Sequence, residues 1–346
     1  MRKLIFGILI LSMLAMPVMA EDITAPPAPD EAEIYMPSEP QTFSEGLLYI
    51  IRKAVGSIEP ELAEAGKLCA SVVAVALLCI MTQQFSGNAK SVSDLVATIL
   101  IAVLLFLPTN VLIGLGRQTI ENLSAYGKLF VPVMTTAMAA QGGITASAAL
   151  YGATTAFAAI LNGLISNFIV PLLYIYLCLS TVNSVLADES LKRLRDFAKW
   201  ITVWSMKAIM YVYTAYMTIT GVISGNVDAS ALKATKLAIS SAVPVIGGLL
   251  SDASETILVG AGVMKNTVGI YGLFVMISLW IGPFLKIGVQ YLLLKLTGAV
   301  ASIFASKQTT ELLNDFTVAM GMLLSMIGVQ TLLLIVSTVC FMRGVT

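Results

Sequence analysis

The chain contains no histidine, and only 12% of its 346 residues are charged. The absence of histidine excludes a Ser-His-Asp triad, an imidazole general base and histidine ligands for a metal. Basic and acidic residues balance at 20 each, so the sequence lacks the clustered positive charge by which proteins recognise nucleic acid. We therefore expect no nucleic-acid partner.

Motifs for nucleotide, cofactor and metal binding are also missing. Residues 66–68 (GKL) lack the Ser or Thr of a Walker A motif, and residues 260–262 (GAG) do not continue to a third glycine. Apolar runs surround each of the four cysteines, Cys69, Cys79, Cys178 and Cys340. Without a CxxC pair, this placement favours small buried side chains over a disulfide or a metal site. We expect no cofactor, no bound metal and no enzymatic activity.

Apolar residues are what the chain has in excess. Hydrophobic residues make up 58% of it and the mean hydropathy is +0.90, whereas a soluble domain is about 45–50% apolar. The apolar residues form continuous runs rather than a strict alternation, which predicts membrane-spanning helices and not a β-barrel. The predicted fold is an all-α polytopic integral membrane protein, a helical bundle over residues 67–346 with short, broken or re-entrant segments.

The first 20 residues are typical of a secretory signal peptide. Arg2 and Lys3 precede a short apolar stretch, and small residues at the end suit cleavage after Ala20. An uncleaved anchor is the alternative. Residues 21–46 are acidic and rich in proline, which predicts a disordered extracytoplasmic tether. Residues 47–66 have an amphipathic pattern, so we expect a surface helix interrupted at Pro60.

The bundle itself is predicted to alternate between spans and polar connectors. Two spans at 68–81 and 95–115 are joined by a short cytoplasmic loop at Lys90, and polar connectors follow at 116–128 and 305–317. Between them, prolines and glycines divide the apolar sequence into three short segments near 129–140, 144–162 and 167–187. An interruption is also expected at Gly282-Pro283.

The densest basic cluster lies in residues 188–200, and it comprises Lys192, Arg193, Arg195 and Lys199. The positive-inside rule places this loop in the cytoplasm. Its spacing is compatible with an amphipathic helix. The basic residues either mark topology alone or form a docking face for a cytoplasmic partner.

Residues 241–272 are apolar but contain helix breakers and ionisable groups. The members that we single out are Pro244, Gly247, Gly248, Asp252, Glu255, Gly260, Gly262, Lys265 and Asn266. Irregular backbone and charge survive at membrane depth only where protein or water shelters them. The stretch is therefore either a broken or re-entrant segment that lines a wet path, or a surface loop between two short helices.

Lys286 and Gln290 extend this candidate pore set. They are four residues apart and share one helix face. Lys286 either lines a polar path or snorkels from a helix end.

Two halves of the sequence resemble each other, which predicts an internal duplication of residues 129–223 and 241–341. The triplet at 131–133 (VPV) recurs at 243–245, and each copy is followed at the same spacing by a proline, Pro171 or Pro283. Residues 194–197 (LRDF) are matched by residues 313–316 (LNDF). Paired halves of this kind are common in membrane transport proteins.

The run SDASETILVGAGVMKN (residues 251–266) and the stretch GGITASAALYG (residues 142–152) resemble the stage III sporulation protein AE family. The resemblance extends from about residue 44 to the end of the chain. It implies a multi-pass protein of the mother-cell membrane that surrounds the forespore, without established catalytic residues.

The resemblance also implies partners and a role. The partners would be a secretion-type ATPase, small membrane proteins, ring-forming proteins and, indirectly, a forespore membrane protein. The implied role is that of a non-enzymatic component of a transenvelope secretion or feeding channel. An autonomous secondary transporter and a passive membrane scaffold are the alternatives.

Overall fold

The computed structural model describes residues 25–38, 42–85, 90–140, 144–186, 188–219 and 267–343. Within these residues all regular structure is helical. The expected all-α membrane fold is therefore confirmed, because five helices are long and apolar enough to cross a membrane.

Three helices form the N-terminal part. The short helix α2 (Asp30–Glu33) precedes α3 (Phe43–Gly56) and α4 (Ile58–Phe85). The hydroxyl of Thr42 accepts a hydrogen bond from the Glu45 backbone N–H and caps α3. The helix is interrupted at Ser57, between α3 and α4. Pro60 lies in the first turn of α4, where a backbone N–H has no helical acceptor, so its missing N–H costs no hydrogen bond.

Long helices make up the rest of the bundle. They are α5 (Lys90–Ala140), α6 (Ile144–Leu164), the π-helix η1 (Ile165–Ile169), α7 (Val170–Leu186), α8 (Glu189–Ile219), α11 (Thr267–Ala301) and α12 (Lys307–Arg343). At about 1.5 Å per residue, the 51 residues of α5 reach about 77 Å. This length exceeds the hydrocarbon thickness of a bilayer, about 30 Å, more than twofold.

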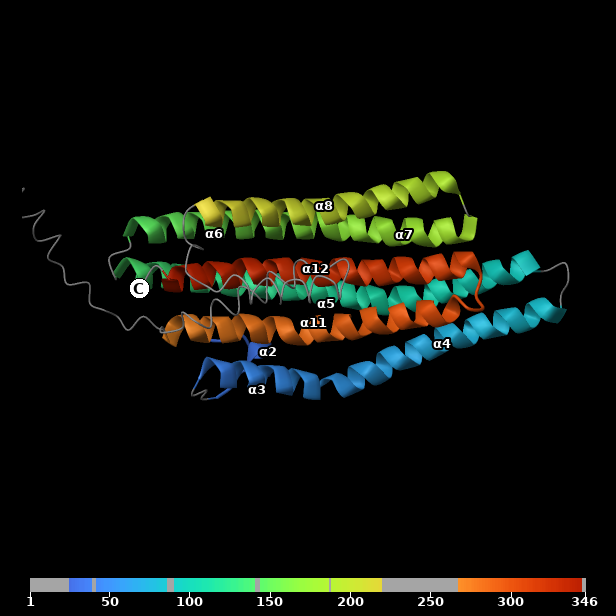
Figure 1. Ribbon diagram of the computed structural model, residues 1–346, viewed down its shortest axis with the longest axis horizontal. Helices are drawn as coiled ribbons and strands as arrows, with labels where there is room; N and C mark the ends of the chain where they lie inside the picture. The colour runs from blue at the N-terminus through green and yellow to red at the C-terminus, as the bar shows by residue number, and fades with distance from the viewer. Residues whose placement is uncertain are drawn as a thin grey trace, which may run out of the picture.

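The helices lie side by side in layers (Figure 1). α6, α7 and α8 form one outer layer, α5 and α12 lie in the middle, and α11 separates α12 from α3 and α4. The helices α4, α7 and α11 all end at the same end of the bundle, whereas α11 begins and α12 ends at the other (Figure 1).

α12 is the central helix. In its most apolar window, 89% of the residues are buried inside the protein, compared with 28–56% for the other four candidate spans. Its side chains contact α5, α6, α7, α8 and α11. The bundle is thus built around α12, and the outer helices shield it.

The predicted polar connector at 116–128 is wrong, because these residues continue α5. Their buried members recur at helical spacing, as at Ile120, Leu123 and Tyr126, so one face of the segment packs into the core. Arg117 and Glu121 lie on the outer face and form an i,i+4 ion pair with 2.9 Å between Nε and Oε1. The charged residues on the outer face of this helix led to the incorrect prediction of a loop.

The connector expected at 305–317 is also shorter than predicted. The turn ends before Lys307, where α12 begins, and Leu312, Leu313 and Phe316 are fully buried on its inner face.

The three short segments predicted between 129 and 187 are likewise incorrect. The first is the end of α5, and the other two join into one helical path through α6, η1 and α7. Pro171 follows the π-helix, in which the backbone N–H of Val170 bonds to the carbonyl of Ile165. Local widening of this kind lets a proline sit within a membrane helix without ending it.

The interruption expected at Gly282-Pro283 does not occur, because α11 is continuous from Thr267 to Ala301. Pro283 has no N–H, so the carbonyl of Leu279 lacks its usual donor four residues later. The helix persists because α12 and α4 pack along it.

Residues 25–38 differ from the disordered tether that the sequence predicts. Ala32 is fully buried, and the backbone N–H of Ala28 donates to the hydroxyl of Tyr271 with 3.1 Å between the atoms. The acidic side chains of this segment are exposed, whereas Ala28, Tyr35 and Met36 pack against the core. We call residues 25–38 the strap.

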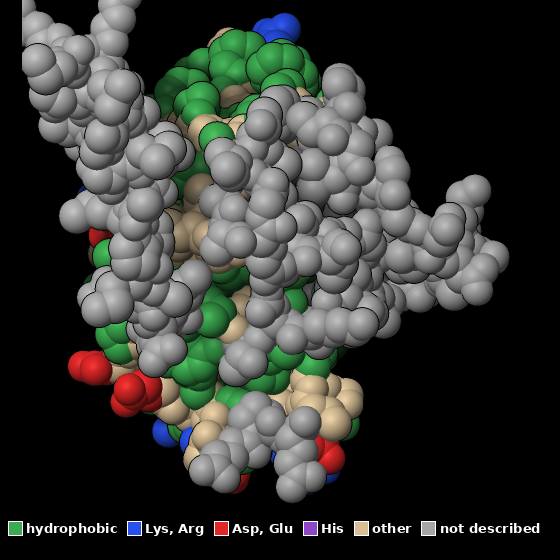
Figure 2. Space-filling view, turned by 90° about the vertical axis from the view of Figure 1, so that its left-hand side faces the viewer, with side chains coloured by type: hydrophobic (Ala, Val, Ile, Leu, Met, Phe, Trp, Pro, Cys, Tyr) green, Lys and Arg blue, Asp and Glu red, His purple; other side chains and the backbone are tan. Residues whose placement is uncertain are grey.

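The outer faces of the bundle are apolar over much of their length. On α5, Val103 and Leu107 are 63% and 72% exposed, and on α8 the rings of Phe197, Trp200 and Trp204 are stacked and exposed. In the end-on view of Figure 2, hydrophobic side chains are visible at the top of the described surface, and acidic and basic ones gather near its lower edge. Such surfaces require lipid or other proteins as neighbours.

Candidate functional site

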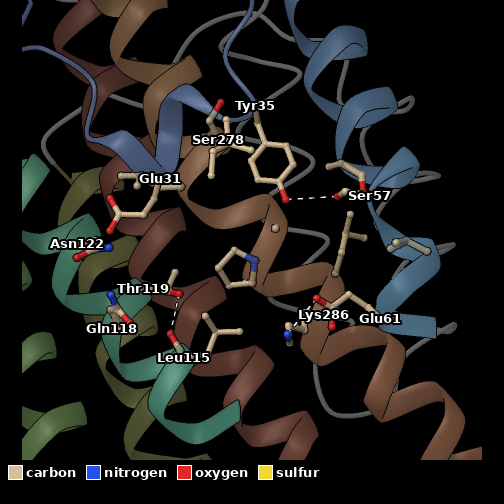
Figure 3. A pocket seen from close by; sticks show the side chains of 17 residues that line it. Glu31, Tyr35, Ser57, Glu61, Leu115, Gln118, Thr119, Asn122, Ser278 and Lys286 are labelled. Atoms are coloured by element: carbon tan, nitrogen blue, oxygen red, sulfur yellow. Dashed lines mark hydrogen bonds and ion pairs between the residues drawn. The ribbon is translucent and has the colours of Figure 1, made fainter. Parts of the chain in front are cut away.

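A polar cleft lies between the α3–α4 junction, α5, α11 and the strap. It consists of two adjoining cavities of about 340 Å³ and about 330 Å³, and Glu61 and Lys286 line both. Figure 3 shows the first cavity, with the ion pair at one side and polar side chains of α5 at the other.

Lys286 and Glu61 form an ion pair that joins α11 to α4. The distance from Lys286 Nζ to Glu61 Oε1 is 2.9 Å, and the side chains are 35% and 29% exposed. Lys286 thus lines a polar cavity. Gln290, the other residue predicted on this helix face, is buried and lines the second cavity.

The strap forms one wall of the cleft. Tyr35 lies over Gly282, where an added Cβ would come within 2.9 Å of its ring. The Tyr35 hydroxyl lies 3.4 Å from Ser57 Oγ at the α3–α4 break, and both side chains are visible in Figure 3. A side chain at position 282 would displace this ring from its place over α11.

Several polar side chains in the cleft have no partner within the described residues. Ser278 is only 1% exposed, yet its hydroxyl makes no hydrogen bond. Gln118 and Asn122 extend from α5 toward the same space, whereas the hydroxyl of Thr119 already donates to the carbonyl of Leu115. The cleft therefore offers unused hydrogen-bonding groups.

A second group of charges is buried between α7, α8 and α12. Arg195 Nη1 lies 2.7 Å from Asp315 Oδ2, and both side chains are less than 10% exposed. The hydroxyl of Tyr176 donates to Asp315 Oδ1 across 3.0 Å. On its outer side, Arg195 also contacts the exposed Asp196.

Burial alone lowers the pKa of the Arg195 guanidinium, but the carboxylates of Asp315 and Asp196 outweigh that effect and raise it. The Arg195 guanidinium therefore remains charged inside the bundle, where it is paired with the Asp315 carboxylate.

The basic cluster predicted from sequence is thus divided. Arg195 points inward and does not belong to the exposed surface, which corrects its assignment as a docking residue. Lys192, Arg193 and Lys199 remain at least partly exposed near the start of α8, and their docking role stays a prediction.

Most of the predicted pore residues lie outside the described part of the chain. This applies to Pro244, Gly247, Gly248, Asp252, Glu255, Gly260, Gly262, Lys265 and Asn266, and also to the cleavage site at Ala20. The broken segment and the signal peptide therefore stay predictions.

Sequence reasoning missed Glu61, Glu31 and Asp315. Glu61 and Asp315 each lie near the start of a helix whose later residues are strongly apolar, and each faces a basic residue far away in sequence. The sequence shows a carboxylate near the start of a spanning helix, and this pattern could have marked both residues. Their basic partners can be identified only from the fold.

Metal and sulfur chemistry gain no support from the described residues. No group of three His, Cys, Asp or Glu side chains among them could hold a metal ion. Among the described residues none of the four cysteines forms a disulfide; Cys69 and Cys340 are buried as expected, whereas Cys178 is exposed.

Long apolar helices around a buried central helix, with a charged cleft at one flank, define an all-α polytopic membrane protein. Residues 39–344 match the family described as stage III sporulation protein AE, and the chain belongs to that family. The resemblance found in the sequence is thereby confirmed, and the strap lies before the matched region.

A curated relative carries the same description. The chain is 24% identical over 246 residues to stage III sporulation protein AE of Bacillus subtilis (strain 168). The alignment covers 69% of this chain and 61% of the relative, so the chain spans less than two thirds of that protein's length. No solved structure matches the chain.

Proposed function

We propose that this protein is a non-enzymatic membrane component of a sporulation-specific secretion or feeding channel between mother cell and forespore, required for late forespore development. Its place would be the mother-cell membrane that surrounds the forespore. Family membership supports a role in sporulation, and the channel assignment is our extension of it.

The length of the helices is the observation that carries the proposal. α5 and α12 have 51 and 37 residues, whereas about 20 suffice to cross a bilayer. Part of the bundle therefore has to lie beyond the hydrocarbon layer. Those parts can contact partners, which we infer to be a secretion-type ATPase, small membrane proteins, ring-forming proteins and, indirectly, a forespore membrane protein.

The exposed apolar faces agree with a bundle that lies only partly within the bilayer. A lone membrane protein needs an apolar belt only as tall as the bilayer, about 30 Å. On α8, exposed apolar residues extend from Leu194 to Val212, and on α5 they extend from Val92 to Val111. At about 1.5 Å per residue each stretch is about 30 Å long. Beyond Val111 the outer face of α5 carries the exposed Arg117, Glu121 and Lys128, so this part of α5 would lie outside the lipid, where other subunits can contact it.

An autonomous secondary transporter is the second candidate, and the Lys286–Glu61 cleft favours it. Such a protein would work without an ATPase or ring proteins, since a gradient would drive it. Affinity purification from sporulating cells in mild detergent separates the two. Co-isolation of the ATPase and ring proteins supports the channel component, whereas a protein that is isolated alone and transports solute in vesicles would refute it.

A genetic experiment tests the role in development. A host strain without this protein should lose late forespore reporter expression and heat-resistant spores, and expression of the chain in the mother cell alone should restore both. Restoration only from forespore expression would contradict the proposed location.

A further inference from the structure

The two cavities of the cleft carry a surplus of negative charge. Three carboxylates, those of Glu31, Glu61 and Glu64, line them together with one ammonium group, that of Lys286. Lys286 is already paired with Glu61, and Glu31, which lines the first cavity, has no cationic partner among the described residues. The cleft therefore attracts positive charge.

Two residues that line the first cavity, Ser278 and Leu279, carry hydrogen-bond acceptors that lack a partner or a helical donor. The hydroxyl of Ser278 is buried and has no hydrogen-bond partner among the described residues. The backbone carbonyl of Leu279 has lost its helical donor because residue 283 is proline. A buried polar group without a partner costs free energy, so a ligand that donates hydrogen bonds to both groups would relieve this cost.

The remaining walls suit the body of an organic molecule. Apolar side chains of Ile34, Leu115 and Leu285 line the cavity beside the polar ones. The ring of Tyr35 forms part of the wall contributed by the strap, and the face of an aromatic ring attracts a cation. The volume of about 340 Å³ is at the lower end of the range for small-molecule sites.

We propose that this cleft binds a small organic cation that carries a primary or secondary ammonium group. The ammonium N–H groups would donate to the Glu31 carboxylate, the Ser278 hydroxyl and the Leu279 carbonyl. The Lys286–Glu61 pair shows that this environment stabilises an ammonium group, since Lys286 Nζ lies 2.9 Å from a carboxylate oxygen. Binding is a property of the isolated protein and is independent of the channel role.

The experiment measures binding of radiolabelled putrescine to the full chain in phosphatidylcholine nanodiscs at about 0.15 M salt, where attraction to bulk lipid charge is absent or screened. Saturable binding is expected, with displacement by unlabelled butylamine but not by butanol or succinate. The Glu31→Gln variant should weaken binding at least about tenfold, since a charge-assisted hydrogen bond is lost. Ser278→Ala should weaken it severalfold.

Glu121→Gln is the matched control, because Glu121 is an exposed carboxylate on α5 that lies outside the cleft. Its affinity should equal that of the unaltered protein. The proposal is overturned if no saturable binding of putrescine is detected, if butanol displaces it equally well, or if Glu31→Gln and Glu121→Gln bind alike.

Discussion

Arg195 and Asp315 form a buried ion pair between α8 and α12, with 2.7 Å between Nη1 and Oδ2. The two residues come from LRDF and LNDF, the matching motifs of the two predicted repeats. Each motif lies near the start of the second helix of a hairpin, α7–α8 or α11–α12, and both hairpins turn at the same end of the bundle (Figure 1). The duplication stays a prediction, but its motifs meet at this pair.

Removal of Asp315 alone should destabilise the bundle strongly. Asp315→Ala leaves the Arg195 guanidinium buried without its partner, and the expected loss is about 3–5 kcal/mol in free energy of unfolding. Replacing both residues, as in Arg195→Met with Asp315→Leu, should recover most of that loss. The measurement is equilibrium unfolding by SDS titration in mixed micelles.

Asp196→Ala is the control for this pair, because Asp196 contacts Arg195 from the exposed side. An exposed ion pair contributes at most about 1 kcal/mol. Equal losses for Asp315→Ala and Asp196→Ala would show that burial does not decide the strength of this pair.

Gly272 marks a close approach of α11 to α5. An added Cβ would overlap the ring of Phe130, which is itself fully buried against Tyr126. Gly272→Ala should therefore reduce the free energy of unfolding by about 1–3 kcal/mol. The change is measured by the same SDS titration.

Gly288→Ala on the same helix is the matched control. Among the described residues, no atom outside the adjacent backbone of α11 lies within 4 Å of the Cβ that it adds. Alanine favours the helix over glycine by up to about 1 kcal/mol, so this variant should be neutral or slightly stabilised. Similar destabilisation by both variants would disprove the close contact at Gly272.

Hydropathy predicted the all-α membrane fold and the family motif predicted the family, but helix lengths were predicted poorly. Arg117, Glu121 and Lys128 indicated a polar connector because composition alone does not show that their side chains all lie on the exposed face of a helix. Likewise Pro283 indicated a break, although packing of α12 and α4 keeps α11 helical. Local patterns show where a helix is under strain, whereas tertiary contacts decide whether it continues.

The candidate site divides in the same way. Lys286 could be identified because a lysine in an apolar helix requires a partner. Its partner Glu61 is 225 residues away, and no local pattern joins the two. The buried direction of Arg195 was equally hidden, since its neighbours Lys192 and Arg193 suggested an exposed cluster.

The strap should control access to the cleft. With Tyr35→Ala, a cysteine introduced as Ser278→Cys should react with a soluble maleimide about tenfold faster, which corresponds to about 1.4 kcal/mol of lost closing free energy. The native cysteines are first replaced by alanine. Labelling rates are followed by mass spectrometry.

Tyr49→Ala serves as the control, because Tyr49 is an exposed tyrosine on α3 that does not line the cleft. It should leave the labelling rate of the introduced cysteine unchanged. If Tyr35→Ala also leaves the rate unchanged, the strap does not cover the cleft.

The Lys286–Glu61 pair should contribute modestly to stability. Both side chains are about one third exposed, so solvent weakens their attraction. A double-mutant cycle with Lys286→Met and Glu61→Gln should give a coupling free energy of about 0.5–1 kcal/mol, measured by unfolding. A coupling indistinguishable from zero would mean that the two groups do not interact in solution.

The hairpin turns predict the orientation of the bundle in the membrane. The turns that contain Asp188 and Ser306 lie at one end, whereas Thr42 at the start of α3 lies toward the other (Figure 1). Lys90, Lys192, Arg193 and Lys307 also lie at or near the first end, so the positive-inside rule places it in the cytoplasm.

Single cysteines at positions 42, 188 and 306, in a chain without native cysteines, test this orientation with a membrane-impermeant maleimide. Thr42→Cys should react in intact protoplasts, whereas Asp188→Cys and Ser306→Cys should react only after permeabilisation. Reaction of Asp188→Cys and Ser306→Cys from opposite sides would overturn the paired hairpins, and reaction of both from outside would overturn the orientation alone.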